Sequence, residues 1–270
     1  MREHRRISGR IFSSGIFGGR ISKADAAICG GVLSFAVVLL GLVGFLLFAP
    51  ATAEETAACG ARRAAKAEVY AEEGTVFRQA PEASSKAAIT CNVDWGEEEI
   101  PEILDILAER GVKITFFVSG KWAQNHPKLL RRMYVEGHEI GNHGYGHKMC
   151  SKLSPEQTVG EIQKTEQAVS ELLGIKTTLF APPAGDYDAQ TVEICRQLGY
   201  KLTLWSADTI DWKEGSDADT ITKRIVKKDL DGAIILMHPK PETVKALPAI
   251  LDELKRRNIQ PVPLYELGIY

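Results

Sequence analysis

The sequence predicts an α/β fold built on a parallel sheet, open or closed into a barrel, with one membrane-spanning helix before it. From about residue 87, short apolar runs alternate with amphipathic helical segments, and repeated strand-then-helix units connect parallel strands. The run 232–238 is nearly all apolar before its final histidine, as expected for a strand buried on both faces of a sheet. The membrane helix is predicted by residues 26–49, which contain no charged side chain.

The N-terminal part of the chain is predicted to be a signal anchor. As a helix, residues 26–49 would be about 36 Å long, whereas the hydrocarbon core of a bilayer is about 30 Å thick. Basic residues outnumber acidic ones in the tail 1–25, so the tail is expected to stay cytoplasmic and the rest of the chain to be exported. We therefore expect a single-pass protein of the cell membrane. The alternative is secretion after cleavage near Ala53, where Ala-Thr-Ala offers a cleavage site.

The remainder of the chain is predicted to be a linker and one globular domain. Residues 50–86 are rich in Ala, Glu, Lys and Ser without a clear apolar period, which predicts a linker, and residues 87–270 form the domain. A net charge of −2 and the lack of a basic stripe argue against a nucleic-acid partner. Five cysteines without paired spacing argue against a disulfide framework. We expect strands at 87–91, 113–118, 177–181, 201–206, 232–238 and 260–264, and helices at 97–110, 121–136, from 155, 187–198, 218–229 and 241–257.

Polar side chains follow the carboxyl ends of the predicted strands. In parallel α/β folds these ends share one edge of the sheet, where ligands bind. His143 and His147 lie four residues apart on a segment that contains glycines, and a close histidine pair on a loop is a common beginning of a zinc site. A helical HExxH site is excluded because Gly144 follows the first histidine. The other interpretation of the pair is two ordinary loop or core histidines.

Several motifs in order along the chain resemble those of the polysaccharide deacetylases, the NodB-homology family or carbohydrate esterase family 4. They read GHEIGNHGYGH at 137–147, Asp-Thr-Ile-Asp-Trp at 208–212 and Ile-Leu-Met-His at 235–238. The resemblance covers about residues 87–268. It implies a distorted (β/α) barrel and a metal-dependent hydrolase that removes N-acetyl groups from cell-wall or related polysaccharides of N-acetylglucosamine type, outside the membrane.

Two motifs depart from the family pattern. The first reads Thr-Cys-Asn-Val-Asp-Trp-Gly at 90–96, so Asn92 stands where the family has its catalytic base. The third reads Ala-Pro-Pro-Ala-Gly at 181–185 and lacks the Arg and Tyr of the family. The chain is closer to a sporulation-type branch with an extended first motif. An amide cannot take up a proton at physiological pH, so either Asp94 doubles as the base, the metal-bound hydroxide needs little help, or the enzyme is weak.

The resemblance assigns a role to each candidate residue. His143, His147 and Asp94 would bind a divalent metal, with Zn²⁺ expected and Co²⁺ or Ni²⁺ as alternatives. His238 resembles the general acid that protonates the departing amine. Without the family's Arg, Asp208 and Asp211 either bind another polar group or cap a loop. The remaining roles are substrate binding by Ala184, Trp212 and Leu236, and support of the site by Asn92, Asp208 and Asp211.

Two other functions stay open from the sequence. The chain could be a non-catalytic relative that binds glycan, which Asn92 and Ala181 favour. It could also be a metallohydrolase that acts on a small amide.

Overall fold

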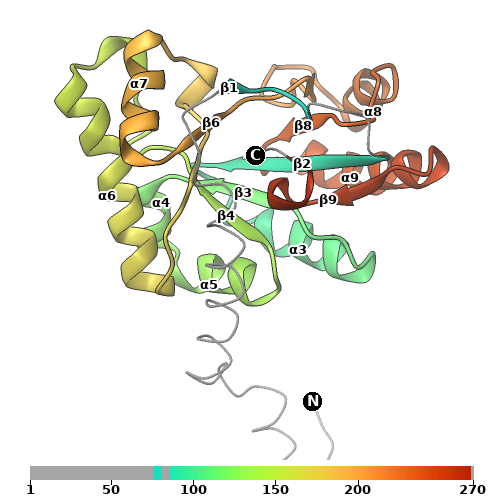
Figure 1. Ribbon diagram of the computed structural model, residues 1–270. Coiled ribbons are helices and arrows are strands. Elements are labelled where there is room, and N and C mark those ends of the chain that lie inside the picture. Colours follow the sequence, from blue (N-terminus) through green and yellow to red (C-terminus); the bar gives the residue numbers. More distant parts are fainter. Residues whose placement is uncertain (1–75, 81–84, 269–270) are drawn as a thin grey trace, which may run out of the picture. The chain divides into compact units, whose positions relative to one another are not determined.

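The computed structural model describes residues 76–80 and 85–268 (Figure 1). The predicted cytoplasmic tail, the membrane helix at 26–49 and most of the linker lie outside these residues. Among the residues described, no helix is long and apolar enough to cross a membrane.

The core of the domain is a curled parallel half-barrel. Every pair of neighbouring strands runs parallel, in the order β1-β6-β5-β4-β3-β2-β8-β7, and β9 also pairs with the beginning of β2. The strands are β1 (Val76–Phe77), β2 (Lys86–Val93), β3 (Thr115–Val118), β4 (Glu139–Asn142), β5 (Leu179–Phe180), β6 (Lys201–Thr203), β7 (Ala207–Asp208), β8 (Ile234–Met237) and β9 (Gln260–Val262).

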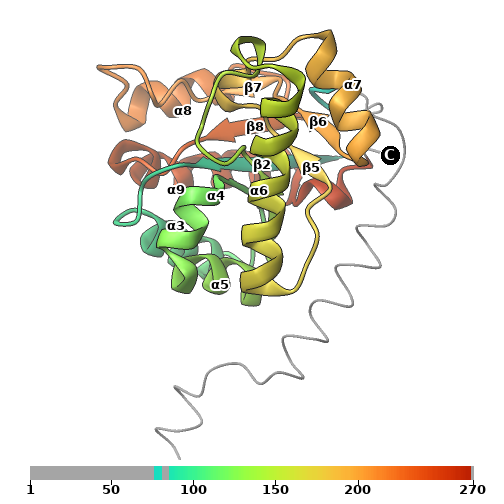
Figure 2. The ribbon, with the colours of Figure 1, turned by 90° about the vertical axis from the view of Figure 1, so that its left-hand side faces the viewer.

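Helices cover the outside of the half-barrel, as Figures 1 and 2 show. Most of them connect one strand to the next, which is the connection that parallel strands require. They are α3 (Ile100–Glu109), α4 (Gly120–Asn125), α5 (Pro127–Val135), α6 (Pro155–Leu173), α7 (Ala189–Leu198), α8 (Ala218–Val226) and α9 (Pro241–Arg256), with short 3₁₀ turns at Cys150–Lys152, Pro183–Gly185 and Leu264–Glu266.

The connection between β6 and β7 shows how far the sheet curls. These strands lie near opposite ends of the strand order, yet only residues 204–206 join them. Four Cα–Cα steps span at most about 15 Å, so the two ends of the sheet must approach each other. The backbone of the connection bridges the gap, because the Leu204 N–H donates to Phe77 O and the Ser206 N–H donates to Ile234 O.

Alternate side chains of each strand enter two different cores. In β2, Ile89 and Cys91 belong to the large outer core with the helices, whereas Ala88 belongs to a smaller core with Phe117 and Ile234. This smaller core fills the inside of the half-barrel. Because side chains alternate along a strand, Thr90 and Asn92 share the inner face with Ala88.

The structure differs from the predicted elements at several places, and the strands β4 and β7 lie outside the predicted strand ranges. The helix predicted at 121–136 is two helices, because Pro127 has no N–H for a helical hydrogen bond and disfavours helical geometry at His126. The strand predicted at 201–206 ends at Thr203. Residues 76–77, predicted as linker, are a strand paired with β6.

Candidate active site

His143 is fixed in one orientation at the end of β4. Its ring is 2% exposed, and its Nδ1 lies 2.7 Å from the carbonyl oxygen of Ala181. A carbonyl only accepts, so Nδ1 carries the proton and Nε2 keeps its lone pair for a ligand. Burial, and after it the neighbouring His147, lower the pKa of His143 to about 3. The ring is therefore neutral near pH 7, as a metal ligand must be.

The loop that carries His147 is held by a carboxylate on α6. Glu161 is 7% exposed; its Oε2 accepts the Gly146 N–H at 2.6 Å and its Oε1 lies 3.2 Å from Lys148 Nζ. Gly144 adopts a φ of +74°, a conformation that glycine reaches without strain. This loop brings the rings of His143 and His147 to a centroid distance of 5.1 Å.

His238 follows β8 and is held by Asp211. Asp211 Oδ1 lies 2.7 Å from His238 Nδ1, and Asp211 Oδ2 accepts the His238 backbone N–H at 2.7 Å and the Thr243 hydroxyl at 2.8 Å. Burial raises the pKa of Asp211, but the contacts with His238 and Thr243 outweigh it and hold this pKa below its ordinary value. An ionised Asp211 makes Nδ1 the protonated nitrogen and directs Nε2 away from the carboxylate.

Trp95 lies beside both histidine groups. Its indole stacks on the His238 ring, with centroids 5.7 Å apart and planes 9° from parallel, and it meets His147 edge-on at 6.5 Å. Lys240 Nζ lies 5.9 Å from the centre of the indole. An open cavity of about 360 Å³ begins at Trp95 and extends along Glu97–Glu99 and Pro239–Pro241. The indole is 38% exposed and forms part of the wall of this cavity.

The position of the family's base is occupied by a buried amide. Asn92 is the penultimate residue of β2, not a residue after the strand as predicted, and it is 4% exposed. Its Oδ1 is buried without a hydrogen-bond partner within residues 76–80 and 85–268. Asp94 follows β2 and is half-buried.

The predicted metal set is brought together only in part. Across the described part of the chain, no group of three or more His, Cys, Asp or Glu side chains is placed to hold a metal ion. Asp94 lies on the turn that leaves β2, and His143 and His147 belong to the loop after β4. The two imidazoles still fit a zinc-type ion, because nitrogen donors suit it and the contact with Ala181 O leaves the lone pair of His143 on Nε2.

Of the other predicted residues, some contact the site and others have structural roles. Asp208 accepts the Ile210 N–H at 2.7 Å and so caps its own turn, whereas Asp211 binds His238. Leu236 is 2% exposed in β8 and Trp212 is 56% exposed. Ala184 is exposed with a left-handed φ of +54° in the turn after β5.

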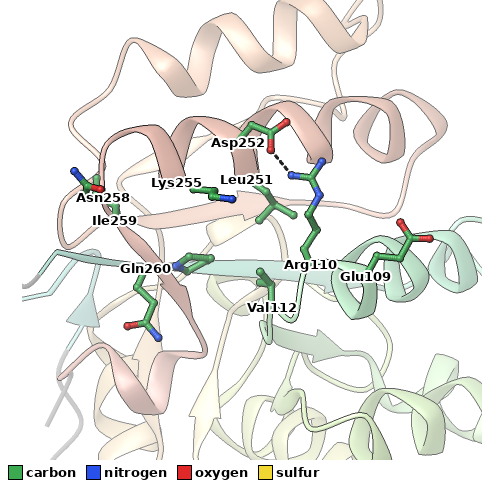
Figure 3. A pocket seen from close by; sticks show the side chains of 10 residues that line it. Glu109, Arg110, Val112, Leu251, Asp252, Lys255, Asn258, Ile259 and Gln260 are labelled. Carbon is green, nitrogen blue, oxygen red and sulfur yellow. Dashed lines mark hydrogen bonds and ion pairs between the residues drawn. The ribbon is translucent and has the colours of Figure 1, made fainter.

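Another cavity lies away from this site. It has a volume of about 640 Å³ and lies between the end of α3, the end of α9 and the beginning of β9 (Figure 3). Arg110 and Asp252, which line it, form an ion pair. The cavity is thus at the amino ends of the strands, and none of the predicted site residues lines it.

Sequence reasoning missed four residues of the site. Trp95 could have been found from the first motif, where an aromatic residue follows Asp94. Thr243 and Glu161 lie on helices α9 and α6, and only the tertiary structure shows which loop they contact. Ala181 acts through its backbone carbonyl, so its side chain gives no signal.

Known proteins resemble this chain in sequence and in fold. A family model described as polysaccharide deacetylase matches residues 80–203. A peptidoglycan-N-acetylglucosamine deacetylase of Bacillus cereus is 34% identical over 187 residues, which cover 67% of this chain and 68% of that protein. The chain belongs to the polysaccharide deacetylase family.

Relatives in this hydrolase family differ in what their names say. The uncharacterized protein YlxY of Bacillus subtilis is 35% identical over 171 residues, 63% of this chain and 53% of YlxY, so the match spans about half of that relative. A crystal structure of a CE4 family pseudoenzyme from Bacillus anthracis aligns with a TM-score of 0.70 and 31% identity, covering 73% of this chain and 70% of the pseudoenzyme. A mutant of that pseudoenzyme is described as having restored enzymatic activity.

Proposed function

We propose that this chain is a metal-dependent N-deacetylase of cell-wall glycans built from N-acetylglucosamine-type units. The observation that carries the proposal is the array of Asp211, His238 and Thr243, at the same edge of the sheet as the pair His143 and His147. A proton donor fixed beside two imidazoles that can bind a metal ion is the arrangement that hydrolysis of an acetamide needs. The names of the Bacillus cereus relatives support the choice of glycan.

His238 would protonate the departing amine. Asp211 holds its Nδ1, so the Nε2 proton is the one available to the sugar nitrogen when the C–N bond breaks. A divalent ion, Zn²⁺ or alternatively Co²⁺ or Ni²⁺, would be held by His143 and His147 with Asp94 as third ligand, and would supply a Lewis acid for the acetyl carbonyl and an activated water. Trp95 would exclude water from one face of His238. Ala184 would offer its backbone N–H to the carbonyl oxygen, and Trp212 and Leu236 would contact the acetyl methyl.

We also propose that the domain lies outside the cytoplasmic membrane and is anchored by residues 26–49. The uncharged segment and the basic tail before it support this location, as does the peptidoglycan named for relatives. Protease treatment of intact spheroplasts should digest the domain and leave a cytoplasmic reporter protein intact. Protection of the domain until the membrane is lysed would contradict the proposal.

The test of the enzymatic function is acetate release from N-acetylglucosamine oligomers by the zinc-loaded full chain. We expect slow but measurable release, and we expect His143→Ala to abolish both release and stoichiometric metal binding. His126→Ala is the matched control, since His126 lies at the start of α5 and contacts Trp122. Full metal occupancy without acetate release across a broad panel of glycans would reject the deacetylase.

A glycan-binding protein without turnover is the second candidate. It is favoured by the buried amide of Asn92 at the family's base position and by the likeness to a CE4 pseudoenzyme. The two candidates differ in one measurement: the binding protein retains N-acetylglucosamine oligomers without releasing acetate from them.

A further inference from the structure

Asn92 presents a polar atom that the protein itself does not satisfy. Its side chain is 4% exposed, and its Oδ1 is buried without a hydrogen-bond partner in the described part of the chain. Buried acceptors in folded proteins are nearly always paired, because leaving one unpaired costs free energy. An acceptor left open next to a reaction site is therefore a place where a ligand donor fits.

The strand pairing directs this side chain toward the mouth of the half-barrel. Asn92 pairs with Phe117, which belongs to the inner core, and shares its face of β2 with Ala88. His238 lies on the corresponding face beyond β8, because it is two residues past Leu236 and four past the inner-core residue Ile234. His143 lies two residues past Gly141, whose Cα faces the Phe117 ring. All three side chains thus share the inner face of the sheet near the carboxyl ends of its strands.

We propose that Asn92 Oδ1 accepts the N–H of the substrate's acetamido group, and that this bond makes the site select acetamides over acetyl esters. The inference rests on the proposed function, because it takes an N-acetylated glycan as the ligand. An acetamide carries one N–H donor, whereas an acetyl ester of the same shape carries none. A site with a buried hydrogen-bonding group discriminates against an analogue that leaves the group unpaired.

The carboxamide of Asn92 can accept a hydrogen bond from a substrate, but it cannot act as a base. An amide oxygen accepts a hydrogen bond but does not take up a proton near neutral pH. Asn92 can therefore orient and retain the N-acetyl group while contributing nothing to the activation of water.

The experiment compares two probes that differ in one group. Binding of methyl 2-acetamido-2-deoxy-β-glucoside and methyl 2-O-acetyl-β-glucoside to the zinc-loaded full chain is measured by ligand-observed NMR titration. We expect the acetamide to bind about tenfold more tightly than the ester. Asn92→Leu should reduce that preference to within about twofold by weakening the acetamide alone, and Asn92→Gln is a second variant that keeps the amide with a longer reach.

Each outcome decides something different. An equal affinity of the wild type for both probes, or an unchanged preference in Asn92→Leu, overturns the inference and leaves the proposed function standing. A loss of zinc affinity in Asn92→Leu overturns it in favour of a metal-ligand role for Oδ1. Failure of the wild type to bind either probe, or oligomers of N-acetylglucosamine, rejects the proposed function itself. Circular dichroism of each variant shows whether it is folded.

Discussion

The His238 side and the Asn92 side of the site differ in how fully their polar atoms are hydrogen-bonded within the protein. On the His238 side, the carboxylate of Asp211 accepts three hydrogen bonds, from the His238 ring, the His238 backbone and Thr243. On the Asn92 side, the amide oxygen has no partner within the residues described. His238, the proposed proton donor, is therefore held in one orientation, while Asn92, at the position of the family's base, carries no ionisable group.

The two sides of the site are also supplied by different segments of the chain. Asp211 comes from the segment after β7 and His238 from the end of β8, whereas Asn92 belongs to β2 itself. A change at Asn92 thus leaves the hydrogen bonds of Asp211 untouched. The likeness to a CE4 pseudoenzyme and to a mutant with restored activity is consistent with a scaffold that survives changes at the site.

Restoring a carboxylate on the Asn92 side is expected to have the largest effect. Asn92→Asp should increase the kcat of acetate release from N-acetylglucosamine oligomers by about 10²–10⁴-fold, the usual contribution of a general base. The measurement is steady-state acetate release by the zinc-loaded protein. The kcat of the variant should fall at acid pH, where the new carboxylate becomes protonated.

The control for that gain is Asn92→Leu, which fills the same buried position without a charge. It should stay at or below the wild-type rate. If Asn92→Asp folds and binds zinc yet releases acetate no faster than wild type, another step limits the rate. In that case the missing carboxylate at position 92 is not the cause of slow release.

Removing the charge on the His238 side should have the next largest effect. Asp211→Asn leaves the histidine without an anionic partner at Nδ1, so we expect a loss of about hundredfold in kcat, best measured in the Asn92→Asp background. Asp208→Asn is the matched control, because Asp208 only caps its own turn through the Ile210 N–H. Equal losses in the two variants would show that the Asp211–His238 contact has no special role.

The sequence allowed His143, His147 and His238 to be placed after the ends of strands, and the reason is local. Histidines after strand ends and a glycine-containing loop can be recognised from residue type and spacing. The sequence does not show whether Asp208 or Asp211 binds His238, because both lie in one short segment. In the structure Asp208 pairs with Leu236 in the sheet, and it is Asp211 that contacts the ring.

The parts that could not be predicted depend on contacts between distant segments. The curl of the sheet follows from a three-residue connection between strands whose order was unknown. The carbonyl of Ala181 and the carboxylate of Glu161 reach the histidine loop from elements that begin far from it in the sequence. The break at Pro127 was visible in the sequence, but the helical period on both sides of it was continuous enough to hide it.

The ionisation of Asp211 should make a smaller contribution, to the free energy of unfolding, and this contribution should be lost at acid pH. The pKa of Asp211 in the folded protein lies below its ordinary value of 3.8, so its ionisation stabilises the fold fully above about pH 4 and progressively less as pH falls through the lowered pKa. The unfolding free energies of wild type and Asp211→Asn should thus differ by about 1–3 kcal/mol at pH 6. Denaturant titrations from pH 6 down to pH 2.5 should show this difference shrinking, and a constant difference would mean that charge is not its source.

The smallest effect we expect tests whether the histidine loop is pre-formed by its backbone. Gly144 has a φ of +74°, so Gly144→Ala should cost about 1 kcal/mol of unfolding free energy by forcing a side chain into the left-handed region. Gly160, in the interior of α6, would meet nothing within 4 Å on gaining a Cβ, so Gly160→Ala should stabilise the protein by about 0.5–1 kcal/mol. If Gly144→Ala also weakens zinc binding while Gly160→Ala does not, the turn at Gly144 holds His143 and His147 in their ligand geometry. If Gly144→Ala lowers and Gly160→Ala raises the free energy of unfolding while zinc affinity is unchanged in both, Gly144 matters for folding alone.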